Sequence, residues 1–402
     1  MPDATTPKPL PLAGMKVLDF TQLIAGPYAT MLLADMGADV TKVERPGAGD
    51  DSRRFLPAIG GESAAFMMVN RNKRSITLNL KNSRAREVFL KLAAQADVLV
   101  ENNRPGTMAK LGVDYEAVKA INPGVIYCSI SGFGHTGPYR DRGGYDLIAQ
   151  AMGGMMSTTG EPDRPPVKIS QPVLDLGTAL FAVYGILTAY VVRQQTGEGQ
   201  WIDTSVFETP VAFQVWEAAG YFGSGEVPKP MGSAHRLAAP YQAYRTGDDR
   251  YIVIATTNES LWSRCCDALG LEPLVGDPRF ESNAKRAANK EALAAIIEER
   301  LATQPAQHWL DRLEAAGVPS GPVNTLDQVF TDPQVLARGM VAEVEHPKAG
   351  KVKTIGLNVK LSKTPGAIRF AAPTLGQHTE EILDSLGYSA GDLEALRREG
   401  AI

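Results

Sequence analysis

Of all residues in this sequence, Asp175 has the position that most suggests a reactive side chain. It directly precedes a long apolar segment, residues 176–192, and a carboxylate beside uncharged residues needs either hydrogen-bond partners or a chemical purpose. As a helix cap, it would accept hydrogen bonds from the amides of a helix that begins at Leu176. As a nucleophile, the same carboxylate would attack an acyl carbon. The two interpretations are compatible, and the spacing by itself favours the cap.

Other candidate residues lie in loops that each follow a short apolar segment. These loops are rich in glycine, proline, amides and isolated cations, which suits close approach of the backbone to a phosphorylated, nucleotide-like ligand. None of them is specific by itself. They are residues 21–27, Arg45 and Pro46, Lys81, residues 102–106 and residues 131–138.

The apolar segments before these loops alternate with helical patterns. Strands are expected at residues 16–20, 40–44, 75–80, 98–101 and 125–130, and helices at 28–36, 84–96 and 115–121. This alternation predicts a parallel sheet covered by helices. Ligands of such sheets bind outside the carboxyl ends of the strands, where the candidate loops stand.

Composition places the chain among globular proteins with a large core. Its 402 residues are 44% hydrophobic and 21% charged, which predicts two domains. The net charge of −4 provides no basic surface for nucleic acid or an anionic membrane, and neither is an expected partner. The N-terminus lacks the apolar region of a secretory signal, so we expect a cytoplasmic protein.

Metal and membrane roles find little support. The three cysteines, Cys128, Cys265 and Cys266, have neither disulfide nor zinc spacing, so buried thiols and no metal are expected. The apolar segment 176–192 falls short of the roughly 20 residues that a membrane span needs. We expect it to be a buried core helix that ends at Gly197.

The fold class alone would suggest a nicotinamide-dependent dehydrogenase, with Glu44 binding a ribose. The first strand, however, is followed by TQLIAGP and not by the glycine pattern G-x-G-x-x-G that contacts a pyrophosphate. A Walker-type phosphate loop is also absent from the sequence.

In its motifs and their order, this chain resembles the family III coenzyme A transferases over nearly its whole length. The segments that carry this resemblance are LDFTQLIAGPYATMLLADMGADVTKVERPGAGDDSR, NRNKRSITLNLK, DVLVENNRPG, SISGFGHTGPY, GGYDLIAQAMGG, the Asp175 segment and LGQHTEEILDSLGY. The resemblance implies an α/β fold with a large Rossmann-like domain from residues 1–206 and 331–402. It also implies a linker at 207–225, a smaller inserted α+β domain at 226–330, and an interlocked homodimer.

Matched residue by residue, the family nucleophile falls on Asp175 and coenzyme A is the co-substrate. Two positions depart from the family pattern, because Asn103 stands where an aromatic residue is common and Ser131 stands where some members have lysine. The coenzyme A contacts implied by the resemblance are Ile24, Ala25, Arg45, Leu78, Lys81, Asn102, Asn103, Arg104, Lys110 and Ser131.

The family mechanism is covalent, with an aspartyl-CoA thioester on Asp175. Two alternatives remain open at this point. The α-methylacyl-CoA racemases share the fold but use a histidine where this chain has Tyr145, and a phenol is a poor base at neutral pH. A non-catalytic acyl-CoA binding protein would not need a reactive Asp175.

The segment GSAHRLAAPYQAYRT is similar to the branch of the family that moves coenzyme A between succinate and other dicarboxylates. We therefore expect succinyl-CoA as donor and a small carboxylic or sulfinic acid with a second anionic group as acceptor. A cation should bind that second group, and His235, Arg236, Arg53 and Arg74 are candidates. Gly232, Ser233 and Ala234 are expected beside the substrate and could form a lid.

Overall fold

The computed structural model describes residues 9–402, which form two compact units. The larger contains residues 9–154, 169–218 and 333–402, and the smaller contains residues 155–168 and 219–332. The expected division differs in two places, since residues 155–168 belong to the smaller unit and the expected linker at 207–225 is largely helical. Its helices are α9 (Glu208–Phe213) and α10 (Val215–Ser224).

A six-stranded parallel sheet forms the centre of the larger unit, which confirms the predicted parallel sheet. The order places the first strand in the middle, with later strands added on either side. The sheet therefore has the strand order of a doubly wound dinucleotide-binding fold, and its switch point lies between β1 and β6. In spatial order the strands are β5 (Lys73–Thr77), β2 (Asp39–Glu44), β1 (Lys16–Phe20), β6 (Val98–Glu101), β7 (Ile126–Ser131) and β8 (Trp201–Ser205).

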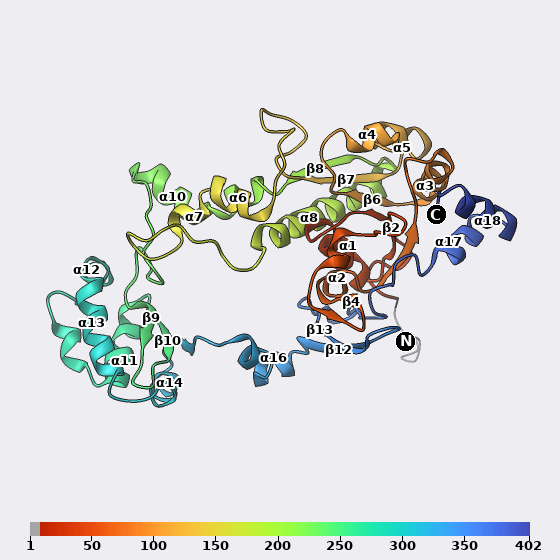
Figure 1. Cartoon of the computed structure of the whole chain (residues 1–402). Coiled ribbons are helices and arrows are strands. Elements are labelled where there is room, and N and C mark those ends of the chain that lie inside the picture. The colour runs from red at the N-terminus through yellow and green to blue at the C-terminus, as the bar shows by residue number, and fades with distance from the viewer. Residues whose placement is uncertain (1–8) are drawn as a thin grey trace, which may run out of the picture. The chain divides into compact units, whose positions relative to one another are not determined.

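Helices cover both faces of this sheet (Figure 1). On one face α1 (Ala25–Asp35) lies beside α8 (Val173–Thr196), and their small residues allow close packing on β1, β6 and β7. Both faces are apolar because parallel strands buried on two sides present apolar residues to each. The other face is covered by α3 (Ser83–Gln95), α4 (Thr107–Leu111), α5 (Tyr115–Ile121), α17 (Thr379–Ser385) and α18 (Ala390–Arg398).

The helix α8 is the predicted apolar helix, and it begins three residues earlier than expected. It ends at Gly197, whose φ of +77° is a conformation that glycine adopts without strain. By length and composition α8 could cross a membrane, a test that core helices of soluble proteins also pass. Leu174, Thr178, Ala182 and Ile186 bury one side of it against the rest of the larger unit, whereas Leu180, Tyr184 and Val191 are exposed, so the expectation of a buried core helix is correct for one side only.

The remaining elements of the larger unit are short. The predicted strand at 75–80 ends at Thr77, because residues 78–81 turn away from the sheet as a loop. The other elements are the 3-10 helix η1 (Asp51–Arg54), β3 (Ala58–Ile59), β4 (Glu62–Ser63), α2 (Ala64–Val69), α6 (Asp146–Met152), α16 (Pro333–Ala337), β12 (Val341–His346) and β13 (Gly350–Ile355).

The smaller unit has its own core around an antiparallel sheet of β9 (Tyr241–Arg245), β10 (Tyr251–Ala255) and β11 (Ser320–Pro322). Trp262, Phe280 and Trp309 are fully or almost fully buried between this sheet and its helices. The helices are α7 (Met155–Thr158), α11 (Glu259–Leu269), η2 (Glu272–Gly276), α12 (Asn283–Ala288), α13 (Lys290–Leu301), α14 (Ala306–Ala315) and α15 (Leu326–Val329).

Candidate active site

A cavity of about 290 Å³ opens at the carboxyl ends of the parallel strands, and we call it the Asp175 cavity. Loops that follow β1, β6, β7 and β8 line it, together with the first turn of α8. It lies at the switch point of the sheet, which is where ligands of open α/β sheets bind. Its lining residues are 22–25, 102–105, Thr107, 130–132, 142–145, Asp175 and Val206.

A second cavity of about 260 Å³, the Leu78 cavity, adjoins the first and shares Gln22, Asn103 and Thr107 with it. Loops after β1, β2 and β5 line it. Arg45 lies at this cavity with an exposed guanidinium 2.6 Å from Asp51. The two cavities together form an extended binding region along the edge of the sheet. The other lining residues are Phe20, Thr21, Val43, Glu44, Gly49, Asp50, residues 78–81 and Leu111.

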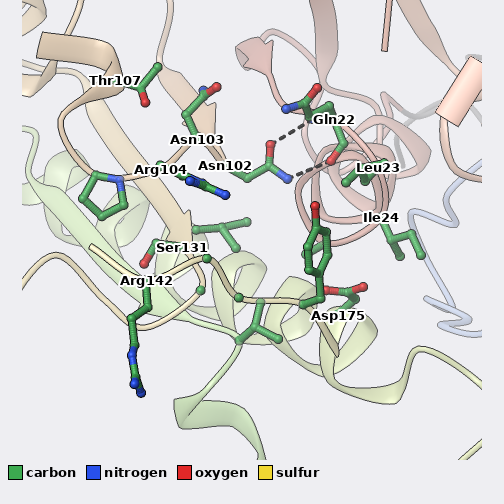
Figure 2. A pocket seen from close by; sticks show the side chains of 18 residues that line it. Gln22, Leu23, Ile24, Asn102, Asn103, Arg104, Thr107, Ser131, Arg142 and Asp175 are labelled. Carbon is green, nitrogen blue, oxygen red and sulfur yellow. Dashed lines mark hydrogen bonds between the residues drawn. The ribbon is translucent and has the colours of Figure 1, made fainter. Parts of the chain in front are cut away.

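The loop after β1 and the loop after β6 are joined where the cavities meet. The Asn102 amide donates to the Gln22 carbonyl at 2.7 Å and accepts from the Gln22 backbone N–H at 2.9 Å (Figure 2). Figure 2 shows Asp175 on one side of this pair and Arg104 on the other, while the Arg142 side chain points away from both. The two bonds tie Gln22, which lines both cavities, to the loop after β6.

Asp175 is not the cap of α8, so that part of the sequence interpretation is wrong. The cap position is Pro172, which makes no side-chain capping bond, and Asp175 is the third residue of the helix. The capping acceptor comes from another helix: Asp146 Oδ2 accepts the N–H of Leu174 at 2.8 Å and that of Asp175 at 3.4 Å. Because those amides are occupied, the Asp175 carboxylate is left to face the cavity.

The charge state of Asp175 differs from that of an ordinary surface aspartate. The residue is half-buried, and burial, with a smaller contribution from the negative charge of Asp146, raises the pKa of Asp175 to about 7. A carboxylate in such a state takes up and releases a proton near neutral pH. Strongly perturbed carboxyl groups in cavities are candidates for catalytic residues.

Glycines allow the loop 142–145 to come close to the end of β7. A side chain at Gly144 would lie 2.5 Å from the Gly132 Cα, and one at Gly143 would lie 3.1 Å from the Arg104 guanidinium. The two backbones and the guanidinium therefore pack in direct contact. This packing places Tyr145, a residue that is 66% exposed, at the cavity that contains Asp175.

A network of buried charges supports the loop after β1. Lys42 and Asp50 form a fully buried ion pair at 2.9 Å, and Lys42 also donates to the Thr21 carbonyl at 2.8 Å. Asp50 accepts the Leu23 N–H at 3.0 Å, which holds Leu23 at a φ of +69°. This network fixes the backbone of residues 21–23, which line both cavities.

A second buried pair lies beside the first. Lys73 donates to Asp19 at 2.9 Å, and Thr21 and Thr30 donate to the same carboxylate. Burial alone would raise the pKa of Asp19, but Lys73, Lys42 and the Thr21 hydroxyl outweigh it and hold the pKa at about 2. Burial likewise opposes the charge of Lys42, yet Asp50, Asp19 and Glu44 raise its pKa.

The cavities bring together most of the predicted binding residues. Ile24, Ala25, Asn102, Arg104, Ser131 and Asp175 line the Asp175 cavity, Arg45, Leu78 and Lys81 line the Leu78 cavity, and Asn103 lines both. Lys110 lies on α4 and lines neither of these two.

The candidates for a distal anionic group lie elsewhere. Neither Arg53 nor Arg74 lines the two cavities. Arg53 donates two bonds of 2.7 Å to Glu44, and Arg74 is paired with Asp39 and Glu381. Gly232, Ser233, Ala234, His235 and Arg236 lie in the smaller unit, where Ser233 accepts the Ala243 N–H at 3.0 Å and the His235 ring packs on Tyr241. Their roles toward a substrate stay predictions.

Sequence analysis does not identify several residues of the site. Asp146 belongs to the segment GGYDLIAQAMGG, but only Tyr145 was interpreted there. The signal for the buried network was Lys42 between Val40 and Val43 in a strand expected at the centre of the sheet, since a buried charge is costly unless it is paired. Within residues 9–402 no group of three or more histidine, cysteine, aspartate or glutamate side chains is arranged to hold a metal ion.

Comparison with known proteins assigns a family to this architecture. A model of the family described as CoA-transferase family III matches residues 12–379. The chain is 42% identical to succinyl-CoA:glutarate CoA-transferase of Mus musculus, with 98% of this chain and 90% of that one covered. It is 37% identical to succinate–glutarate CoA-transferase of Agrobacterium fabrum, with 96% and 98% covered. A crystal structure of a CAIB/BAIF family protein from Brucella suis has a TM-score of 0.85, 41% identity, and 94% and 100% coverage.

Proposed function

Because the chain belongs to CoA-transferase family III, we propose that it transfers coenzyme A from succinyl-CoA to a small dicarboxylic acid through a covalent intermediate on Asp175. The observation that carries the proposal is the position of Asp175, which faces a cavity at the switch point of the sheet with a pKa near neutrality. The names of the two similar transferases support the substrate class.

The chemistry follows from a carboxylate beside a thioester. The ionised Asp175 attacks the thioester carbonyl, the carbon–sulfur bond breaks, and a mixed anhydride and a coenzyme A thiolate form. The thiolate then attacks the aspartyl carbonyl of the anhydride, which releases succinate and leaves an aspartyl-CoA thioester. The acceptor carboxylate attacks that thioester and reverses the two steps. Every intermediate keeps an activated carbonyl, so no ATP is needed.

Each step passes through an oxyanion that needs hydrogen-bond donors. Ala25 is the first residue of α1 and lines the same cavity as Asp175. No side chain caps α1, and the first amides of a helix have no partner within the helix. Because Pro27 has no N–H, we assign the amides of Ala25 and Gly26 as the oxyanion donors, and the pair of Lys42 and Asp50 holds the loop that leads into them.

The Leu78 cavity is the proposed site for the nucleotide part of coenzyme A. It combines the apolar Leu78 and Leu111 with the exposed cations Arg45 and Lys81, which suits a base and its phosphates. The pantetheine would then pass the Gln22–Asn102 pair toward Asp175. For the second carboxylate of the acid, Arg104 is the cation that Figure 2 shows among the lining residues near Asn102.

Trapping of the intermediate tests the proposal. The protein is incubated with succinyl-CoA and then with borohydride, which reduces an aspartyl thioester to the alcohol, and peptides are analysed by mass spectrometry. We expect a modification confined to the peptide that contains Asp175, and none in Asp175→Ala. Absence of any adduct, together with exchange of an α-proton of a branched acyl-CoA into deuterated solvent, would instead indicate a racemase. A preference for acetyl-CoA over succinyl-CoA would refute the proposed donor.

We also propose a homodimer. The outer side of α8 exposes large apolar residues, including Leu180, Tyr184 and Val191, which are 53%, 70% and 57% exposed. Contiguous apolar surface of this kind indicates an interaction site. Light scattering should give twice the 43.1 kDa chain mass, and Tyr184→Glu should lower it. A monomer at micromolar concentration would refute this assignment.

A further inference from the structure

We propose that Asp146 is a positioning residue for the reaction, which fixes the first turn of α8 and occupies the amides that would otherwise stabilise the Asp175 carboxylate. The carboxylate is thereby a stronger nucleophile than an aspartate in the first turn of a helix would ordinarily be. The inference rests on the proposed role of Asp175 as the nucleophile.

The hydrogen bonds of Asp146 reach from one helix to the start of another. Asp146 is the first residue of α6, and its Oδ2 accepts the N–H of Leu174 at 2.8 Å and of Asp175 at 3.4 Å. The first amides of a helix lack partners within it, and an aspartate in that turn often gains from them. Here the amide of Asp175 itself is directed to a different carboxylate.

The other oxygen of Asp146 is held as firmly. Its Oδ1 accepts from the Gln150 side-chain amide, and Gln150 is fully buried. The Gln150 carbonyl oxygen in turn accepts the Ile169 N–H at 2.9 Å. Both ends of residues 169–175 are therefore attached to α6, which leaves the first turn of α8 little freedom to move.

The negative charge of Asp146 adds to the effect of burial on Asp175. Burial is the largest cause of the raised pKa of Asp175, and the charge of Asp146 is the second. Among the residues that the structure describes, Asp146 is the one charged group that contributes. The other titratable or charged groups on the elements packed against α8, and in the cavity, are Tyr28 and Asp35 on α1, Tyr127 and Cys128 on β7, Asp203 on β8, Glu208 on α9, and Arg104, Arg142 and Tyr145.

This arrangement has a chemical consequence. The reactivity of an oxygen nucleophile rises with its basicity, while its ionised fraction at a given pH falls, and the best compromise lies near the working pH. A pKa of about 7 places Asp175 at that compromise at neutral pH. An aspartate stabilised by helix amides would be fully ionised and less reactive.

The pH dependence of kcat/KM for succinyl-CoA in Asp146→Asn tests the inference. Asparagine keeps an oxygen that accepts the two amides but removes the charge. We expect the acid limb of the profile to move down by about one pH unit, and the plateau at high pH to fall about two- to fivefold. Asp146→Ala, which removes the charge and also frees the two amides, should move the acid limb at least as far down, and it is the second variant if the asparagine variant fails to fold.

Asp141→Asn is the matched control. It removes a charge from the preceding loop, where Asp141 is 80% exposed at its side chain and 3.5 Å from Arg140. Its profile should match that of the wild type. An acid limb that stays in place in folded Asp146→Asn and Asp146→Ala, or a loss of rate that is equal at every pH, would overturn the inference. Borohydride trapping on wild-type Asp175 separates this outcome from a failure of the proposed function.

Discussion

Two regions of the larger unit each contain a carboxylate that is at least partly buried. In one region neighbouring cations compensate its charge, and in the other none does. Beneath the loop after β1, Asp19 is fully buried but receives Lys73 and two threonines, and its pKa falls to about 2. At the start of α8, burial and, to a smaller extent, the neighbouring Asp146 carboxylate raise the pKa of Asp175 to about 7. In this contrast the compensated charges hold the backbone of the loop after β1, whereas the uncompensated carboxylate faces the cavity.

The largest expected effect comes from removal of the uncompensated charge. Asp175→Asn should lower turnover by at least about 10³-fold, because the proposed nucleophile is lost. Its stability should not fall, and at pH 8 it should rise by roughly 1–3 kcal/mol, since a poorly solvated carboxylate is removed. Steady-state kinetics and urea unfolding measure the two effects. A variant that loses stability, or one that retains turnover, would contradict this half of the comparison.

Removal of a compensating charge should have the reverse result. Lys73→Met leaves Asp19 buried without its cation and should lose about 3–5 kcal/mol of unfolding free energy. The exposed Lys16 on β1 gives a matched control, and Lys16→Met should change stability by less than about 0.5 kcal/mol. Addition of Asp19→Asn to Lys73→Met should restore part of the loss. If the double variant is as unstable as the two separate losses added together, the pair is not coupled.

The pH dependence of stability should separate the two regions. Asp19 has a pKa of about 2 in the folded chain against 3.8 in the reference state, so its contribution of about 2 kcal/mol is present above pH 4 and is lost as the pH falls toward 2. Asp175 keeps a proton that the unfolded chain gives up, so its contribution falls as the pH rises from about 4 to 7.

Urea unfolding of wild type and Asp175→Asn from pH 2.5 to 8 measures both contributions. The variant should lack part of the decline between pH 4 and 7 and should keep the acid limb unchanged. Curves that differ by a constant at every pH would mean that Asp175 has an ordinary pKa in the folded protein, and the comparison would fail.

The sequence predicted much of the fold and of the cavity wall for a physical reason. Alternating strands and helices force a parallel sheet, and the loops after its strands must meet at one edge, so residues such as Ile24, Asn102 and Ser131 could be grouped from their places along the chain. The capping partner of α8 could not be grouped in this way. Asp146 reaches Leu174 across 28 residues, and spacing along one helix says nothing about an acceptor from another.

The smallest expected effect tests whether the buried charges determine the shape of the cavity wall. Leu23 is held at a φ of +69° by the bond from its N–H to Asp50. Leu23→Gly relieves about 1 kcal/mol of backbone strain but gains a similar amount of unfolded-state entropy, so its stability should change by less than about 0.5 kcal/mol. Leu23→Val, which is β-branched, should lose about 1–2 kcal/mol at the same position. Thermal unfolding of the two variants measures the difference. Equal stability in both would mean that the turn relaxes to an ordinary φ. In that case the pair of Lys42 and Asp50 would not impose the backbone conformation of the loop that lines the cavity with Asp175.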